Sequence, residues 1–395
     1  MYGVSYLLFG VLFTFSFLIH IVYAIRQEKE LVLFPTLLSI TLHFAISWYN
    51  HAVEPTIGAD EDAIMFIENA MGIDLKFYFG TEFYLVLMKL YFITFEQSAL
   101  IGHAMSSFAF SVGLYYFFKI TDVLALSNVS RLLSVLVIGF LPTSVLFFSI
   151  SLRESYQFLF LVLSVLYLLN FLVHKRTGYF LIAVFFSVLM SFFHKGLLPI
   201  AFFNILVVLY ITYRNSPVFP ILAGGMVFLL LIVGGAASTS SSRGVEVIGA
   251  IASGDIMNYV EIYRQSGEGL ATRATYSISG DFGVFNIVIF PFLYLVYYMF
   301  YPFVWKVAGV TDLYASIEGL IRLCGVYLIF FRWRRLVFSD AKTRLLVYCM
   351  LISSIIWAAG TTNFGTGIRH HIVHDWLLLL VCLYTYEKKN YKEFN

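Results

Sequence analysis

Charge is what this sequence has least of. Only 12% of its 395 residues are Asp, Glu, Lys or Arg, whereas 60% are hydrophobic. A soluble domain carries about 25% charged residues, so this composition argues against a water-soluble globule. Repeated apolar runs are close to the length that crosses about 30 Å of hydrocarbon. The sequence therefore predicts an all-α, polytopic transmembrane bundle of about 10–13 helices, in which residues 1–395 form a single integral membrane domain.

Cysteine and an excess of basic charge are also lacking. Cys324, Cys349 and Cys382 lie in apolar stretches without a CxxC or Cys/His spacing, and they predict neither a disulfide framework nor a zinc site. The net charge is only +2, so no nucleic-acid partner is expected. The first span, Gly3 to Ile25, has no basic n-region and no cleavage signal, which predicts a retained helix. No separate soluble domain is expected.

Apolar runs place the expected helices along the chain. The segment 82–95 is apolar but short and carries Lys89, which predicts a half-span or an interfacial helix. Residues 178–212 predict two short helices hinged at His194-Lys195-Gly196. Clearer spans are expected at about 3–25, 31–48, 98–118, 131–150, 156–173, 217–236, 283–304, 316–331, 343–360 and 372–386.

Lys and Arg in short loops predict the orientation, because such loops stay in the cytoplasm. The outer face then receives polar loops at about 50–80, 237–280 and 361–371, together with two short turns at 153–154 and 194–195. The number of membrane crossings agrees with this orientation only if residues 82–95 do not cross the membrane fully. One further crossing or re-entrant segment is also needed between residues 237 and 316. The residues predicted to be cytoplasmic are Arg26, Lys29, Lys175, Arg176, Arg214, Arg332, Arg334, Arg335, Lys342, Arg344, Lys388 and Lys389.

The first outer loop contains three adjacent carboxylates, Asp60, Glu61 and Asp62. One interpretation is a solvated loop at a helix N-terminus, where acidic side chains interact favourably with the helix dipole. The other is a catalytic site in which one of the three acts as a general base. A divalent cation is possible in that case, because it would offset the repulsion between neighbouring carboxylates.

Two short turns between apolar spans carry Arg153-Glu154 and His194-Lys195. Charges at membrane depth are costly and therefore mark functional or paired positions. Arg153 and Glu154 either neutralise each other at a helical hairpin or form a phosphate site, since the planar guanidinium fork suits phosphate oxygens. Lys195 either extends to the lipid headgroups or neutralises a diphosphate beside Arg153.

A polar motif precedes the last span, Asn363-Phe364-Gly365-Thr366-Gly367-Ile368-Arg369-His370-His371. Its glycines let the backbone approach a ligand closely. Arg369 supplies a fixed positive charge, while His370 and His371 can donate protons or bind oxygen. The alternatives are a polar turn anchored at the headgroups and a metal site formed with His374 and Asp375, although no metal is expected. The motif is expected to be a loop, with residues 374–376 opening the final helix.

The longest polar segment covers 237–280 and has mixed charge, including Arg264 and Arg273. Such a segment suits a mobile loop that covers a sugar site. The alternative is a plain extramembrane loop without a role in binding.

In this order of motifs the chain resembles bacterial polytopic glycan-assembly proteins, meaning GT-C-type glycosyltransferases and the O-antigen and exopolysaccharide polymerases. The resemblance implies a place in the cytoplasmic (inner) membrane, a polyprenyl-(di)phosphate-linked sugar donor and a glycan or lipid-linked acceptor. It matches Asp60, or Asp62, to the catalytic acid of the first outer loop. It matches Arg153, Lys195 and Arg369 to basic positions that hold the donor phosphate. GT-C enzymes often carry a soluble domain after the helices, and its absence favours a polymerase or a minimal transferase.

Three rivals to a transferase remain open. A repeat-unit polymerase or ligase would use Arg and His and would not need the acidic loop. A transporter or flippase would often show internal repeats and broken helices in matching halves. A structural subunit would not need basic turns clustered on one face.

Overall fold

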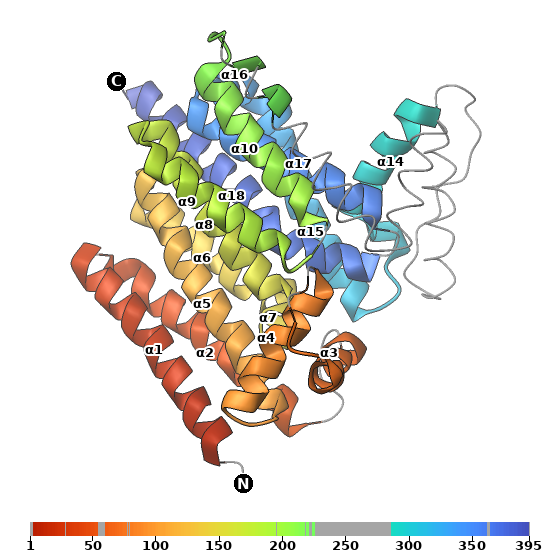
Figure 1. Cartoon of the computed structure of the whole chain (residues 1–395). Coiled ribbons are helices and arrows are strands. Elements are labelled where there is room, and N and C mark those ends of the chain that lie inside the picture. Colours follow the sequence, from red (N-terminus) through yellow and green to blue (C-terminus); the bar gives the residue numbers. More distant parts are fainter. Residues whose placement is uncertain are drawn as a thin grey trace.

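The computed structural model describes residues 3–27, 29–53, 60–76, 78, 80–194, 196–217, 219–220, 223–225, 286–361 and 364–394. Within these ranges every regular element is a helix, which confirms the predicted fold class (Figure 1). Three predictions fall on other residues. Most of the span at 217–236 and all of the polar segment 237–280, with Arg264 and Arg273, lie outside the described residues, and so does Lys195.

The first half of the chain contributes eight described helices. They are α1 (Gly3–Gln27), α2 (Glu30–Ala52), α3 (Asp60–Gly72), α4 (Thr81–Thr94), α5 (Ala99–Val123), α6 (Asn128–Phe140), α7 (Pro142–Phe147) and α8 (Glu154–His174). The second half contributes α9 (Thr177–Ser191), α10 (Leu197–Tyr213), α14 (Asn286–Phe300), α15 (Val310–Tyr327), a π-turn (Leu328–Arg332), α16 (Arg334–Ser339), α17 (Ala341–Gly360) and α18 (Phe364–Phe394).

Among the described residues, five helices are long and apolar enough to cross a membrane: α1, α2, α8, α15 with its π-turn, and α17. The short helix α4 is bent by 118° relative to α5, as suits a segment that does not cross by itself. The helices α9 and α10 flank the predicted hinge at 194–196. These features indicate a multi-pass membrane protein.

Three expected boundaries were wrong. The single span at 131–150 is two helices, because Leu141 is extended before Pro142, which cannot continue the hydrogen-bond ladder of α6. The segment 50–80 is not a plain loop, because it contains α3; since α3 begins at Asp60, the acidic triplet does lie at a helix N-terminus, as one of its two interpretations predicted. The loop at 361–371 is helical from Phe364, so α18 starts ten positions earlier than expected.

Gly367 shows why the last of these predictions failed. A glycine costs about 1 kcal/mol in a helix interior, which predicts a break. A Cβ at Gly367 would make ordinary contacts with Thr361 and Tyr298, at 3.6 and 3.9 Å, so the position lies against neighbouring side chains. The helix continues through it despite the local preference.

The last helix, α18, forms the axis of the bundle (Figure 1). It packs against α6, α7, α8, α15, α16 and α17. The Trp376 ring lies edge-on to Phe117 of α5 and Phe158 of α8, with centroids 6.0 and 6.5 Å away. Leu377 and Leu380 are fully buried. Polar residues on α18 are therefore held in place by the core.

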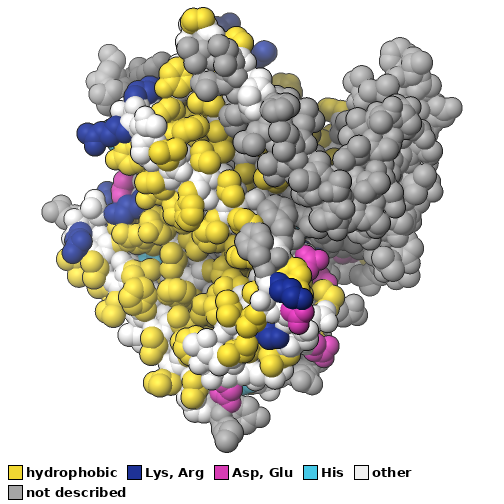
Figure 2. Space-filling view, viewed as in Figure 1, with side chains coloured by type: hydrophobic (Ala, Val, Ile, Leu, Met, Phe, Trp, Pro, Cys, Tyr) yellow, Lys and Arg dark blue, Asp and Glu magenta, His cyan; other side chains and the backbone are white. Residues whose placement is uncertain are grey.

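The two ends of the bundle differ in charge. Figure 1 places the N-terminus of the chain and α3 at one end, and the C-terminus at the opposite end. In Figure 2 most visible Lys and Arg side chains gather toward the C-terminal end and most visible acidic ones toward α3, with an apolar surface between them. At the C-terminal end Lys388 pairs with Asp340, and Lys342 donates to the Val123 carbonyl oxygen at 2.8 Å. This separation matches the predicted sidedness.

Gly113 tests the packing of α5 on α8. A Cβ there would lie 2.6 Å from the Phe158 ring and 3.4 Å from the Leu159 Cα. We expect Gly113→Leu to lower the free energy of unfolding in detergent by about 1–3 kcal/mol, because overpacking forces the two helices apart. Gly178→Leu is the matched control, since no atom lies within 4 Å of its Cβ position. Equal losses in the two variants would contradict this packing.

Candidate functional site

Polar side chains from five separate segments meet at the α3 end of the bundle. We call them the polar cluster: Asp62, Thr81, Arg153, Glu154, His194, Arg369 and His370. They come from α3, the start of α4, the turn between α7 and α8, the turn between α9 and α10, and α18. The sequence predicted most of these residues but not their contacts.

An ion pair joins Asp62 of α3 to Arg369 of α18, across 307 positions of sequence. The Asp62 side chain is 42% exposed, whereas that of Arg369 is only 15% exposed. The carboxylate is therefore the half of the pair that can move into solvent, and the guanidinium is the fixed half. The side chains of Asp60 and Glu61 lie outside the described residues, so only Asp62 of the acidic triplet is placed.

Arg153 is half-buried beside this pair. Its Nη1 donates to Thr81 Oγ1 at 2.6 Å and to the Phe193 carbonyl oxygen at 3.4 Å, and its guanidinium carbon lies 5.5 Å from the centre of the Phe66 ring. Its Nε, and Oε2 of the buried neighbour Glu154, have no hydrogen-bond partner among the described residues. Burial lowers the pKa of Arg153, an effect that Glu154 opposes and the nearby charge of Arg369 reinforces. The two guanidinium groups thus share one site.

A glycine brings Thr81 to this arginine. Gly80 has a φ of 94°, a conformation that side-chain-bearing residues rarely adopt. Its N–H donates to the Phe192 carbonyl oxygen at 3.0 Å, which ties the start of α4 to the turn between α9 and α10. The same turn supplies the Phe193 carbonyl oxygen that accepts from Arg153.

His194 and His370 form an aromatic group beside Arg153. The His370 ring stacks on Trp357 with centroids 3.6 Å apart, and the His194 ring lies 6.1 Å from it. Nδ1 of His194 accepts from the Gly196 N–H at 3.0 Å. Burial, and then the charge of Arg153, lower the pKa of His194 to about 3. His194 is therefore neutral near pH 7, and because its Nδ1 accepts a hydrogen bond, Nε2 carries the ring proton.

His371 does not belong to this cluster. It was predicted to bind the donor phosphate with Arg369 and His370, but successive helical residues point about 100° apart. The His371 Nε2 interacts with the Tyr298 carbonyl oxygen at 2.7 Å, and its Nδ1 lies 3.5 Å from Asp375 Oδ1. It therefore faces α14 and α15.

A second polar group, the buried charge group of Glu318, Arg322 and Asp375, was not predicted. Arg322 Nη1 lies 2.9 Å from Asp375 Oδ2, and its Nε donates to the Met299 carbonyl oxygen at 2.7 Å. Glu318 accepts from Thr143 Oγ1 at 2.8 and 2.9 Å. Two opposite charges four positions apart in an otherwise apolar span were the signal that sequence reasoning overlooked.

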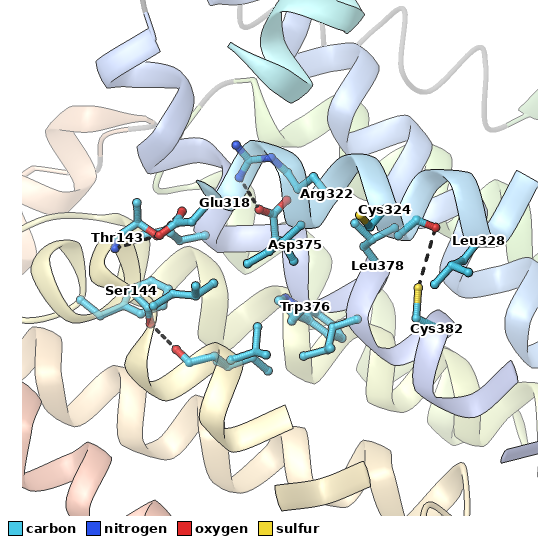
Figure 3. A pocket seen from close by; sticks show the side chains of 18 residues that line it. Thr143, Ser144, Glu318, Arg322, Cys324, Leu328, Asp375, Trp376, Leu378 and Cys382 are labelled. Atoms are coloured by element: carbon cyan, nitrogen blue, oxygen red, sulfur yellow. Dashed lines mark hydrogen bonds and ion pairs between the residues drawn. The ribbon is translucent and has the colours of Figure 1, made fainter. Parts of the chain in front are cut away.

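A cavity of about 270 Å³ lies against this group, between α15, α18 and the α6–α7 pair. Figure 3 shows Thr143, Glu318, Arg322 and Asp375 toward one end of it, with Cys324, Leu328 and Cys382 toward the other. The remaining lining is almost entirely apolar. The cavity is therefore amphipathic along its length.

Among the described residues, His371, His374 and Asp375 could hold a metal ion, since their ligand atoms lie within 4.8 Å of one another. Their hydrogen bonds argue for a different role. His374 Nδ1 contacts the His370 carbonyl oxygen at 3.0 Å and its Nε2 contacts Ser354 Oγ at 3.2 Å. Asp375 is already neutralised by Arg322. In the acidic triplet, Asp62 is likewise paired with an arginine, so a cation there would have to displace Arg369.

Neither a protein-family model, nor a curated protein sequence, nor a solved structure matches this chain. The fold and the composition define a helical, multi-pass membrane protein with a polar cluster at one end and a buried charge group inside. These two sites hold the polar side chains from which a function can be inferred.

Proposed function

We propose that this chain is a glycosyltransferase of the cytoplasmic (inner) membrane, which uses a polyprenyl-(di)phosphate-linked sugar in the assembly of cell-surface polysaccharide at the outer face. One observation carries the proposal. An exposed carboxylate, Asp62, is paired with Arg369 beside a second, half-buried arginine, Arg153, at the end of the bundle that bears few other basic residues. An acid and two guanidinium groups are the side chains that transfer from a phosphate-linked donor requires.

The arginines would hold the donor. A phosphate is a stronger multivalent acceptor than a carboxylate, so it competes with Asp62 for Arg369. Arg153 has an Nε without an acceptor among the described residues, and it can turn this donor toward the same anion. Both charges would then stabilise the negative charge that develops on the leaving phosphate.

Displacement of the ion pair would free the base. Once Arg369 binds phosphate, the Asp62 carboxylate is no longer held by the guanidinium and can turn toward the acceptor. It can then accept the proton from the acceptor hydroxyl, whose oxygen forms a bond to the anomeric carbon of the sugar. The bond between that carbon and the phosphate oxygen breaks, and the phosphate leaves with the electron pair. We keep the predicted role of Lys195, which is to bind the donor phosphate. We also keep that of the polar segment 237–280, with Arg264 and Arg273, which is to cover the sugar.

Asp62→Asn tests this assignment directly. In proteoliposomes supplied with a polyprenyl-phosphate hexose and a glycan acceptor, we expect this variant to transfer sugar about 10²–10⁴-fold more slowly, because the amide cannot accept the proton. Asp74→Asn is the matched control, since Asp74 lies near the same end but is 68% exposed in a pair with Lys76. Transfer at the normal rate by Asp62→Asn would refute a catalytic role for this acid.

A polymerase or ligase is the second candidate, and the arginine and histidine side chains of the cluster favour it. His370 is buried and Arg153 and His194 are half-buried, whereas the Asp62 side chain is 42% exposed. If Asp62→Asn keeps full activity while Arg153 variants lose it, the chemistry belongs to Arg and His, and analysis of glycan chain length would distinguish repeat-unit polymerisation from single transfer. Movement of a fluorescent lipid-linked sugar across the bilayer without transfer would instead identify a flippase.

A further inference from the structure

The cavity of Figure 3 is separate from the polar cluster and has no part in the proposed transfer. Its charged end is formed by Glu318, Arg322 and Asp375, and its other end by apolar side chains. Glu318 and Arg322 are only 4% and 3% exposed. Ionisable groups this deeply placed in a membrane protein mark functional sites, because burying them is costly.

The cavity opens at the exposed face of α15, which is apolar as a lipid-facing surface would be. Ile321 lines it and is nevertheless 47% exposed, and the neighbouring Ile317 on α15 is 51% exposed. The wall of the cavity is thus continuous with the lipid-facing surface of α15. Apolar cavities stay empty of water, so a hydrocarbon chain from the bilayer is the occupant that suits these walls. A volume of about 270 Å³ holds roughly nine groups of the size of water, or a chain of about ten carbons.

The charged side chains at one end of the cavity determine which polar end group the occupant can carry. Arg322 and His371 both lie beside Asp375, at 2.9 and 3.5 Å. The hydrogen-bond donors that reach Glu318 directly are the Thr143 hydroxyl and its N–H, at 2.8 and 3.3 Å. Two carboxylates thus face one guanidinium in a buried group. An anionic end group would add a further negative charge there, whereas a hydrogen-bond donor would complement Glu318.

We propose that this cavity is a binding site for a single-chain amphiphile that enters from the bilayer between α15 and the α6–α7 pair and carries a donor end group, an amine or an alcohol. The chain lies along Ile321, Cys324, Leu328, Leu378 and Cys382, and the end group binds Glu318. The site excludes anionic amphiphiles such as fatty acids.

Photo-crosslinking in nanodiscs tests the proposal on the intact chain. The probes are three amphiphiles of about ten carbons with a diazirine in the chain and an amine, an alcohol or a carboxylate at the end. We expect the amine and alcohol to label peptides of α15 and α18 that line the cavity at least about tenfold more than the carboxylate does. Labelling of α1, whose Leu7 and Phe15 are 69% and 52% exposed, gives the baseline for ordinary lipid contact.

Two variants sharpen the experiment. Glu318→Gln keeps the shape of the site but removes its charge, and we expect it to lose the preference for the amine over the carboxylate. Leu378→Trp should fill the cavity and bring labelling down to the α1 baseline, whereas Leu181→Trp, on the lipid-facing surface of α9 at 61% exposure, should not change it. Equal labelling by amine and carboxylate in the unmodified chain, or cavity labelling no higher than that of α1, would overturn the proposal without bearing on the transferase activity.

Discussion

Arg153→Lys is expected to lower sugar transfer by at least about 100-fold, the loss typical of removing one donor that stabilises charge in a transition state. Lysine keeps the positive charge, but it has no planar fork, so it cannot keep the contacts to Thr81 Oγ1 and the Phe193 carbonyl oxygen and also present two parallel donors to a phosphate. The loss should appear mainly in kcat, because the charge that remains still attracts the donor. Steady-state kinetics in proteoliposomes measure both parameters.

The control for this variant is Arg176→Lys, an exposed arginine at the opposite end of the bundle, just before α9. We expect its kinetics to be unchanged. Thermal unfolding of Arg153→Lys in detergent separates a local loss from a folding defect, since the buried Glu154 keeps a positive neighbour in this variant. Normal kcat in a folded Arg153→Lys protein would show that the fork of Arg153 has no part in the reaction.

Arg322→Met is expected to have the largest effect on stability, a loss of about 3–5 kcal/mol in the free energy of unfolding. It removes the guanidinium that pairs with Asp375 at 2.9 Å and leaves that carboxylate buried without its strongest partner. The same substitution also removes the donor to the Met299 carbonyl oxygen, which joins α15 to α14. Denaturant unfolding in detergent micelles measures the change.

The double variant Arg322→Met with Asp375→Leu shows whether the lost stability comes from the missing ion pair itself or from the Asp375 carboxylate that is left buried without a partner. Replacing both partners of a buried ion pair by apolar residues is often neutral, so we expect the double variant to recover most of the stability. Arg332→Met, on the exposed end of the π-turn after α15, should stay within about 0.5 kcal/mol of the unmodified chain. A double variant as unstable as Arg322→Met would mean that Asp375 is not the group left uncompensated.

Most residues of the polar cluster were predictable one by one, because each places a charge or a histidine next to an apolar span; Thr81 was not. Arg153, His194 and Arg369 all stand out in this way, and in the structure the charge of Arg153 acts on His194 and that of Arg369 on Arg153. The position of His371 was not predictable from its neighbours. It depends on the rotation of α18 about its own axis, which directs adjacent histidines to different helices.

The buried charge group was not predicted from the sequence, although two of its residues are conspicuous there. Glu318 and Arg322 stand four positions apart in a span expected to be plain membrane helix, and their spacing alone is compatible with a simple intrahelical pair. The structure separates them toward different partners, Thr143 of α7 and Asp375 of α18. Partners so distant in sequence follow from how three helices pack, and no local pattern encodes them.

By itself, the sequence determined the membrane environment of this protein and its all-helical class, although not the ends of every helix. Hydrophobic content and the length of apolar runs are local properties, and in hydrocarbon every backbone polar group must find its partner within the helix. The tertiary structure alone decided that Asp62 meets Arg369, that Gly367 lies inside a helix and that a cavity forms beside Glu318. These outcomes depend on the rotation and close approach of packed helices, which are set by contacts between residues far apart in the chain.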